Sequence, residues 1–389
     1  MFRKRHLVIT AVLTAAIVWA LASVYFNLAG YNSADTLIRA RNTIAENYVN
    51  PLTEEQLTKM NDMAISAMVY SLGDQYSSYL NAQDMVSYQE DKKESYQGIG
   101  VSVNFDARTN AMTVISPYDG SPAQKAGVRP GDVITKVDDI TVTADTYDDV
   151  LSYIKSGTDE VFDLVLKRGD EIVTVSVRRE EVKRQSVTHK MFGGRIGYIR
   201  VSEFIHNTKD EFKTAIEDLK SRDMSGLVID LRNNPGGYAD TVIAMTDSLL
   251  PEGIIAYLED NQGNRQYFNS DEEELGLPMV VLINQGTASA SELLAGSLQA
   301  HGLATIIGEK SYGKAVGQSV YPLTPKTAIY LTSARYFTPK GNCIDGVGIE
   351  PDVTVALDEE LMGKISILEP EEDAQLSKAL EIMAQKTGQ

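Results

Sequence analysis

Hydroxyl side chains cluster in one short segment of the chain, Thr287-Ala-Ser289-Ala-Ser291-Glu292. An apolar run, Met279-Val-Val-Leu-Ile283, precedes this cluster, and a helix-like stretch from 292 to 300 follows it. The pattern predicts a short buried strand, a tight connection and a helix. A hydroxyl at such a connection lies beside backbone N–H groups that have no partner within the helix and can hold a developing negative charge. The segment therefore has the residue types of a nucleophilic serine site.

A lysine follows the serine cluster at a spacing that allows the two to meet. Lys314 lies 25 residues after Ser289, beyond a second apolar run, Leu303-Ala-Thr-Ile-Ile307. Two adjacent strands would bring the serine and the lysine together. A lysine amine has a reference pKa of about 10.4 and must lose its proton before it can act as a base, which burial favours. A serine activated by a lysine is a known nucleophile–base pair.

Gln318 lies four residues after Lys314, on the same face of either a strand or a helix. Its side chain can accept a hydrogen bond from the lysine amine and hold that amine toward the serine. The same residues also have an interpretation without chemistry. Ser289 and Glu292 fit a helix capping box, and the lysine and glutamine would then be ordinary surface residues.

The segment from 284 to 318 closely resembles the carboxyl-terminal processing peptidases, also called tail-specific proteases. Their pattern is a serine cluster ending in Ser-Glu, a later Gly-Lys, and a glutamine four positions after the lysine. The resemblance implies that Ser289 is the nucleophile, Lys314 the general base and Gln318 the residue that orients the lysine. The family's spacing favours Ser289 over the competing Ser291. The competing base, Lys310, is not preceded by glycine and has no glutamine four residues later.

Two further motifs of that family occur in the expected order. Asp230-Leu-Arg-Asn-Asn-Pro235-Gly236-Gly237 follows a strand-like segment, and Gly346-Val-Gly348-Ile-Glu-Pro351-Asp352 follows strand-like Ala328-Ile-Tyr-Leu331. The resemblance implies that the backbone N–H groups of Gly237 and Ala290 bind the oxyanion. A simple flexible turn is the plainer interpretation of the glycine pair.

Residues 98 to 179 have the strands and helix expected of a PDZ domain. Strand patterns lie at 101–103, 112–115, 161–166 and 172–177, with a helix pattern at 144–154. By resemblance, the substrate's C-terminal carboxylate would bind backbone N–H groups in a loop formed by Gly98, Ile99, Gly100 and Val101. The glycines are otherwise turn residues.

The N-terminus predicts a membrane segment. Arg3-Lys4-Arg5 precedes an uncharged run from Leu7 to Phe26, whose 20 residues could cross a bilayer as a helix. The basic flank should stay in the cytoplasm and the rest of the chain on the far side. A cleavable signal peptide is the alternative, with Ala20-Leu-Ala22 as its cleavage site. Either way, the catalytic body is expected outside the cytoplasm.

The composition excludes several classes of function. The formal charge is −18, with 54 acidic and 36 basic residues, which disfavours nucleic acid as a partner. The sequence has no Walker-type phosphate loop. Cys343 is the single cysteine, and the four histidines have no metal-ligand spacing. We therefore predict no metal and no other cofactor.

The patterns divide the chain into five segments. From about residue 196, strand-like and helix-like segments alternate, which predicts an α/β core with buried, partly parallel strands. The resemblance implies a crotonase/ClpP-like peptidase core, an inserted or preceding PDZ domain and N-terminal helices. The segments are an anchor or signal peptide (1–30), a helical region expected to pack as a bundle (31–95), the PDZ domain (96–183), the serine peptidase core (184–356) and a helical tail (357–389).

The expected function is an extracytoplasmic serine endopeptidase that recognises protein substrates near their C-termini; the resemblance adds a homodimer. One alternative is a Ser–His–Asp protease built on His6, His189, His206 or His301, although no Gly-x-Ser-x-Gly elbow occurs. The other is an inactive membrane-anchored PDZ adaptor, which would be expected to lose its nucleophile or base. A crotonase-type acyl-CoA enzyme would share only the core topology.

Overall fold

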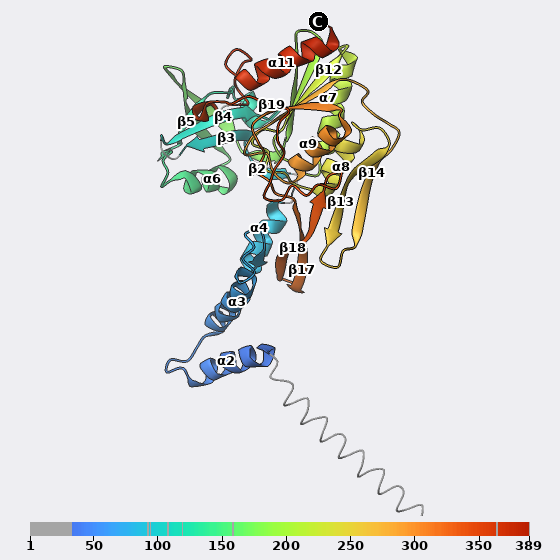
Figure 1. The fold of residues 1–389 in the computed structure, drawn as a ribbon. Helices are drawn as coiled ribbons and strands as arrows, with labels where there is room; N and C mark the ends of the chain where they lie inside the picture. Colours follow the sequence, from blue (N-terminus) through green and yellow to red (C-terminus); the bar gives the residue numbers. More distant parts are fainter. Residues whose placement is uncertain are drawn as a thin grey trace, which may run out of the picture. The chain divides into compact units, whose positions relative to one another are not determined.

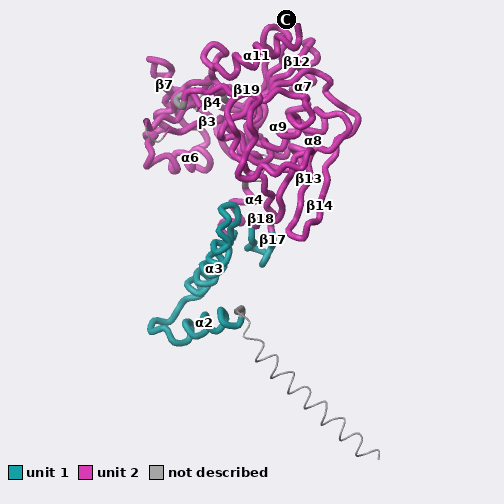
Figure 2. Tube along the Cα trace, in the orientation of Figure 1, with its two compact units in different colours: residues 1–82, 321–330 teal, residues 83–320, 331–389 magenta. Residues whose placement is uncertain are grey.

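The computed structural model describes residues 33–388, with gaps at 92, 94, 107–108, 119, 158 and 363–364. The chain divides into two compact units (Figure 2). Unit 1 contains the residues up to 82 and the segment 321–330, and unit 2 contains 83–320 and 331–389.

Unit 1 has two helices and one short strand: α2 (Ser33–Asn47), α3 (Glu54–Tyr70) and β1 (Ser78–Leu80). The predicted capping box starts α3, because the Gln56 N–H donates to the Thr53 hydroxyl and the Thr53 N–H donates to the Gln56 side chain. β1 pairs antiparallel with residues 328–330. These helices confirm the helix pattern.

The predicted packed bundle is wrong for unit 1, because the apolar stripe of its helices is largely exposed. Ile38 is 57% and Met63 is 64% exposed, whereas the buried apolar residues described in this unit are Val69, Tyr79 and Ala328. Two helices joined through Pro51 have too few neighbours to cover each other's apolar faces. Exposed apolar residues from α2 to the turn after α3 are Leu37, Ile38, Ile44, Tyr48, Val49, Met63, Met68, Tyr70 and Leu72.

The first half of unit 2 is the part predicted as a PDZ domain. Its sheet has the order β3-β4-β5-β7-β8, with β6 beside β5, and β2 pairs separately with β9. A buried apolar cluster fills the space between this sheet and α6. The elements, which begin with α4, are α4 (Ala82–Asp91), β2 (Ser95–Gly98), β3 (Val101–Asp106), β4 (Ala111–Pro117), α5 (Pro122–Lys125), β5 (Val133–Val137), β6 (Ile140–Thr141), α6 (Tyr147–Ser156), β7 (Val161–Arg168), β8 (Glu171–Arg178) and β9 (Glu180–Lys183).

The second half of unit 2 is built on a six-stranded sheet of order β10-β11-β12-β15-β16-β19. β10 is antiparallel to β11, and the other neighbouring pairs are parallel. The elements are β10 (Val187–Phe192), β11 (Ile196–Val201), α7 (Thr208–Ser221), β12 (Gly226–Asp230), α8 (Ala239–Asp247), β15 (Met279–Ile283), α9 (Ala290–His301), β16 (Ala304–Gly308), β19 (Val353–Thr354), α10 (Glu359–Met362) and α11 (Ala374–Thr387).

Both faces of this sheet are covered by helices (Figure 1). Along β15, Val281 packs in the cluster that includes α7, α8 and α9, whereas its neighbours Val280 and Leu282 pack against α11. A strand buried on both faces is apolar throughout, which explains the run at 279–283. The predicted α/β core with buried, partly parallel strands is confirmed.

An antiparallel region adjoins this core. β13 (Gly253–Asp260) pairs with β14 (Arg265–Ser270) and with the last residues of β18 (Thr327–Phe337). β18 also pairs with β17 (Val316–Thr324), which begins two residues after Lys314. The start of β17 therefore sets the position of the candidate lysine.

In the part of the chain that the structure describes, no helix combines the length and the apolarity needed to cross a bilayer. The predicted anchor at 7–26, and the signal-peptide alternative, lie outside the described residues.

Candidate active site

Ser289 occupies the turn between β15 and α9, with an unusual backbone conformation. Its φ is 56° and its ψ is −118°, a region that residues with a β-carbon rarely adopt and that typically costs about 1–3 kcal/mol. A nucleophilic serine on a strained strand-to-helix turn is a recurring catalytic device. The turn also places Ser289 at the N-terminal end of α9, where the helix dipole favours negative charge.

The carboxylate of Glu292 connects this turn to the candidate lysine. Glu292 is fully buried, and its Oε2 accepts hydrogen bonds from the N–H of Ser289 and the N–H of Lys314, both at 2.8 Å. Its Oε1 accepts from the Gly313 N–H at 2.7 Å and from the Ser311 hydroxyl. One carboxylate thus holds the backbones of Ser289 and Lys314 side by side, although they are 25 residues apart in sequence.

Gly313 fixes the approach of the lysine segment. Its φ is +88°, and a β-carbon at this position would lie 2.8 Å from the Gly348 nitrogen. The Gly313 carbonyl accepts the N–H of Gly346 at 2.9 Å. The Gly-Lys pair therefore contacts the later Gly-Val-Gly motif, although the two motifs are far apart in the sequence. This contact lies beside Lys314, which is partly buried.

Gln318 is the third residue of β17. Its side-chain nitrogen donates to the Thr332 hydroxyl on β18 at 3.3 Å. Its contact with the lysine amine remains a prediction.

The glycine pair after β12 packs directly against the serine turn. A β-carbon on Gly236 would lie 2.8 Å from the Ser289 Cβ and 2.9 Å from the Ala290 nitrogen. Gly237 is held against Phe204, whose carbonyl accepts the Tyr238 N–H at 2.7 Å. Among the hydrogen bonds of the described residues, none is donated by the N–H of Gly237 or Ala290. The role of Gly237 and Ala290 as oxyanion donors remains a prediction.

Polar side chains connect the loop after β12 with the turn that carries Ser289. The Asn284 side-chain oxygen accepts the Asn233 N–H at 2.8 Å, and the Thr287 hydroxyl donates to the Leu231 carbonyl at 2.9 Å. The buried Tyr336 hydroxyl donates to the Ser289 carbonyl at 3.1 Å, and burial raises the pKa of this phenol well above its usual range, so that it stays a neutral donor. Sequence reasoning missed these supports because Glu292 and the asparagines have ordinary capping and turn interpretations.

The competing residues have other contacts. Ser291 is fully buried, and its hydroxyl donates to the Asn234 carbonyl at 3.0 Å. The ammonium of Lys310 pairs with Glu350 at 2.6 Å on the surface. These contacts favour Ser289 and Lys314.

The described histidines do not form a triad with Ser289. His189 pairs with Asp218 of α7, and the ring of His206 stacks on Tyr238. His301 ends α9, a helix of 12 residues that is about 18 Å long, so it lies far from Ser289. His6 lies outside the described residues.

A buried ion cluster stabilises the β12 end of the site. Arg232 is fully buried between Asp230, at 2.6 Å, and Asp373, at 2.8 Å. Burial by itself would raise the pKa of Asp230, but the guanidinium groups of Arg232 and Arg200 lower it to about 2. Asp373 also caps α11 by accepting the N–H of Gln375 and of Leu376. The C-terminal helix is thereby tied to the strand that leads into the glycine pair.

Backbone hydrogen bonds hold the loop that is predicted to bind carboxylates. The Ile99 carbonyl accepts the Ala123 N–H at 2.8 Å, and the Gly100 carbonyl accepts the Tyr118 N–H at 2.9 Å. Gly100 has a φ of +69°, and a β-carbon there would lie 2.4 Å from the Ser121 Cβ.

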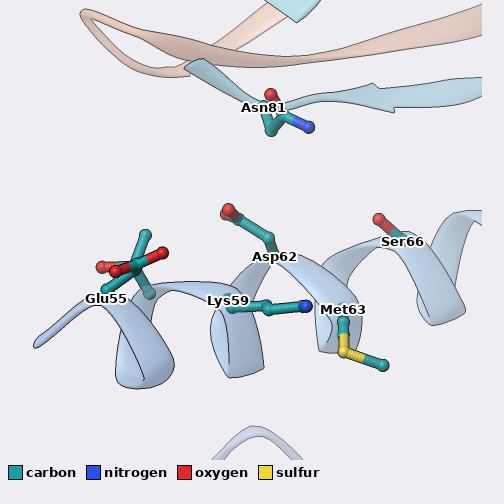
Figure 3. Close-up of a pocket in the computed structure, with 7 residues that line it drawn as sticks. Glu55, Lys59, Asp62, Met63, Ser66 and Asn81 are labelled. Atoms are coloured by element: carbon teal, nitrogen blue, oxygen red, sulfur yellow. The ribbon is translucent and has the colours of Figure 1, made fainter. Parts of the chain in front are cut away.

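A pocket of about 600 Å³ on unit 1 is lined by Glu55, Lys59 and Asp62 of α3 and by Asn81 (Figure 3). No group of three or more potential metal ligands is found within the described ranges.

Comparison with known proteins gives the following similarities. Residues 195–355 match peptidase family S41, and residues 113–168 match the PDZ domain. The chain is 36% identical over 306 residues to the carboxy-terminal-processing protease of Bartonella bacilliformis, covering 76% of this chain and 70% of that protein. It is 30% identical over 357 residues to a probable CtpA-like serine protease of Staphylococcus aureus, covering 90% and 71%.

Two solved structures are similar in fold. The photosystem II D1 C-terminal processing protease has a TM-score of 0.51 and 29% identity, covering 85% of this chain and 90% of that one. A putative S41 protease from Bacteroides fragilis has a TM-score of 0.62 and 17% identity, covering 82% and 90%, which shows the fold alone.

Proposed function

This chain belongs to peptidase family S41, as a serine-type peptidase with a PDZ domain, and on that basis we propose that it is an endopeptidase that uses Ser289 as nucleophile and Lys314 as general base. The observation that carries the proposal is the buried carboxylate of Glu292. It accepts the backbone N–H of both residues at 2.8 Å and so makes them neighbours, which a serine–lysine pair needs before its side chains can come within hydrogen-bond reach.

The proposed reaction has two steps. The Ser289 hydroxyl attacks the scissile carbonyl while the Lys314 amine takes its proton, and the N–H groups of Gly237 and Ala290 bind the oxyanion. The lysine then gives the proton to the leaving amine, and water hydrolyses the acyl-enzyme ester. Gln318 orients the lysine. The cycle needs the neutral amine of Lys314, because only a neutral amine can accept the serine proton.

The test is cleavage of an unstructured protein with an apolar C-terminus, with fragments followed by mass spectrometry. Ser289→Ala and Lys314→Ala should each lower kcat/KM by at least about 10⁴-fold, as in other serine hydrolases. Ser291→Ala and Lys310→Ala are matched controls and should leave most activity. Equal cleavage by all five proteins would rule out this site, and loss on substitution of the histidines would favour the Ser–His–Asp alternative.

Substrate selection is proposed to use the PDZ domain. Its loop from Gly98 to Val101 would bind the C-terminal carboxylate of a protein or peptide and deliver the chain to Ser289. The hydrogen bonds from the N–H groups of Tyr118 and Ala123 to carbonyls of this loop support a fixed orientation of its own N–H donors. An inactive adaptor would bind such C-termini without cleaving them.

The N-terminal segment supports a location outside the cytoplasm. The basic flank and apolar run of residues 3–26 support a catalytic body on the far side of the cytoplasmic membrane. A protease added outside intact spheroplasts should then digest the chain, and full protection would contradict this location.

The exposed apolar side chains of α2 and α3 support a homodimer formed through unit 1.

A further inference from the structure

The ring of Tyr96 lies over the start of the proposed carboxylate loop. Tyr96 is on β2, two residues before Gly98, and a β-carbon on Gly98 would lie 2.5 Å from the Tyr96 Cε2 and 3.0 Å from its Cδ2. Gly98 has an ordinary backbone conformation, because its φ is not among the positive values. A β-carbon at Gly98 would therefore meet the ring, whereas the backbone conformation alone would allow one.

The Tyr96 hydroxyl reaches the loop's own N–H groups. Its oxygen accepts hydrogen bonds from the backbone N–H of Gly100 and of Val101, and it is also hydrogen-bonded to the Tyr118 hydroxyl. Consecutive backbone N–H groups aimed at one oxygen form the type of concavity that binds anions. The phenol oxygen thus occupies donors that a ligand carboxylate would use.

The charges around this oxygen favour an anion. Burial, the largest effect, raises the pKa of Tyr96, so the phenol is neutral at neutral pH. The guanidinium of Arg184 lies close enough to act on both Tyr96 and Tyr118, and it forms two 2.9 Å hydrogen bonds to Glu203. A neutral hydroxyl therefore occupies a position whose donors and nearby cation suit a negative charge better.

We propose that Tyr96 sets the specificity of the loop by competing for its N–H groups, so that a ligand must bring a full carboxylate to displace the hydroxyl. This inference rests on the proposed binding of C-termini by the PDZ domain. Hydrogen bonds to an ionised acceptor are roughly twice as strong as those to a neutral one. A C-terminal carboxylate can displace the phenol, whereas a C-terminal amide or an internal peptide carbonyl cannot.

The competition has a measurable consequence. A ligand that must first displace an internal group binds with an affinity reduced by the fraction of protein in which the site is open. One net hydrogen bond is worth about 0.5–1.5 kcal/mol, so removing the Tyr96 hydroxyl should tighten carboxylate binding by about 2- to 12-fold. The ring of a phenylalanine would still cover Gly98.

The experiment uses the full chain carrying Ser289→Ala, so that bound peptides stay intact. Fluorescence anisotropy would measure two peptides of one sequence with an apolar last residue, one ending in a carboxylate and one in an amide. With Tyr96→Phe, the carboxylate peptide should bind about 2- to 12-fold more tightly, and the amide peptide, whose carbonyl oxygen then no longer has to displace the hydroxyl, should also bind more tightly than it does to the parent. Tyr153→Phe is the matched control, because the Tyr153 hydroxyl donates to Asp138 elsewhere in the domain.

A second measurement does not depend on any ligand. Without peptide, amide hydrogen exchange in the fragment that carries Gly100 and Val101 should be faster in Tyr96→Phe than in the parent, and unchanged in Tyr153→Phe. A parent that prefers the carboxylate, with Tyr96→Phe binding no more tightly, would overturn the role of Tyr96 and leave the proposed function standing. If neither protein distinguishes carboxylate from amide, the proposed C-terminal recognition itself fails.

Discussion

At the scale of single residues, the turn at Ser289 is held from three sides. The Glu292 carboxylate binds its N–H, the Tyr336 hydroxyl binds its carbonyl, and Gly236 packs against its side chain. These contacts offset the cost of a positive φ at a residue with a β-carbon. The strain is therefore local, and the groups that maintain it are specific side chains that can be changed one at a time.

Glu292→Gln is the most direct test of that support. The carboxylate accepts from three backbone N–H groups and one hydroxyl, whereas an amide has one acceptor oxygen and would turn an NH₂ group toward donors. Each buried donor left unsatisfied costs about 1–3 kcal/mol. We expect kcat to fall by about 100-fold or more, because about 1 Å of misplacement has that effect, with a much smaller change in KM.

The exposed Glu350 provides the control, since its side chain is 68% exposed and pairs only with Lys310 in the described contacts. Glu350→Gln should keep kcat and KM within about twofold, in line with surface pairs of this kind. If Glu292→Gln changed KM alone, or only lowered the free energy of unfolding at full kcat, the carboxylate would not be positioning the serine and the lysine.

At the scale of elements, buried strands were the most predictable feature. The apolar run at 279–283 coincides with β15, and the helix-like stretch at 292–300 lies within α9 (Ala290–His301), because an element buried in a core is rich in apolar residues. The hairpin of β13 and β14 was missed, since strands such as Arg265–Ser270 are mostly exposed and polar. Tertiary contacts, not local pattern, define them.

In the candidate site, too, some features could be predicted from the sequence and others could not. The spacing of Ser289, Lys314 and Gln318 predicted which residues to test, and those roles remain predictions. The link through Glu292 could not be predicted, because a capping box and a buried acceptor of distant N–H groups have the same local sequence. The contact of Gly313 with Gly348 likewise joins two motifs whose sequences say nothing about each other.

The ion cluster that joins β12 to α11 predicts a pH dependence of stability. The folded-state pKa of Asp230 is lowered from 3.8 to about 2, so its contribution is fully present above pH 4 and is lost as the pH falls toward 2. The shift corresponds to about 2 kcal/mol. The difference in the free energy of unfolding between the parent and Asp230→Asn should therefore shrink by about that amount between pH 5 and pH 2.

Urea titrations of both proteins at several pH values would measure this difference. Taking the difference removes the titration of the other carboxylates, which both proteins share. A difference that stays constant over this range would mean that the Arg232 guanidinium does not lower the pKa of Asp230.

At the scale of the whole molecule, the two units differ in how they satisfy their apolar residues. The core sheet of unit 2 is covered on both faces, but α2, α3 and the segments that follow them leave nine large apolar side chains exposed. Large exposed apolar patches usually mark an interaction surface. A net charge of −18 opposes nonspecific association, so a specific partner must supply the missing contacts.

A second copy of the chain is the partner we expect, because a two-fold axis lets one apolar face cover its own copy. Sedimentation velocity on the full chain in detergent should show a dimer. Ile38→Glu or Met63→Glu should convert it to a monomer, since each would bury a charge without a partner at the interface. Ile172→Glu is the matched control: Ile172 is 64% exposed, as is Met63, but lies on the PDZ sheet, and the dimer should persist. A monomer at every concentration for the parent, or equal dissociation by Ile172→Glu, would show that the exposed face of α2 and α3 does not drive assembly.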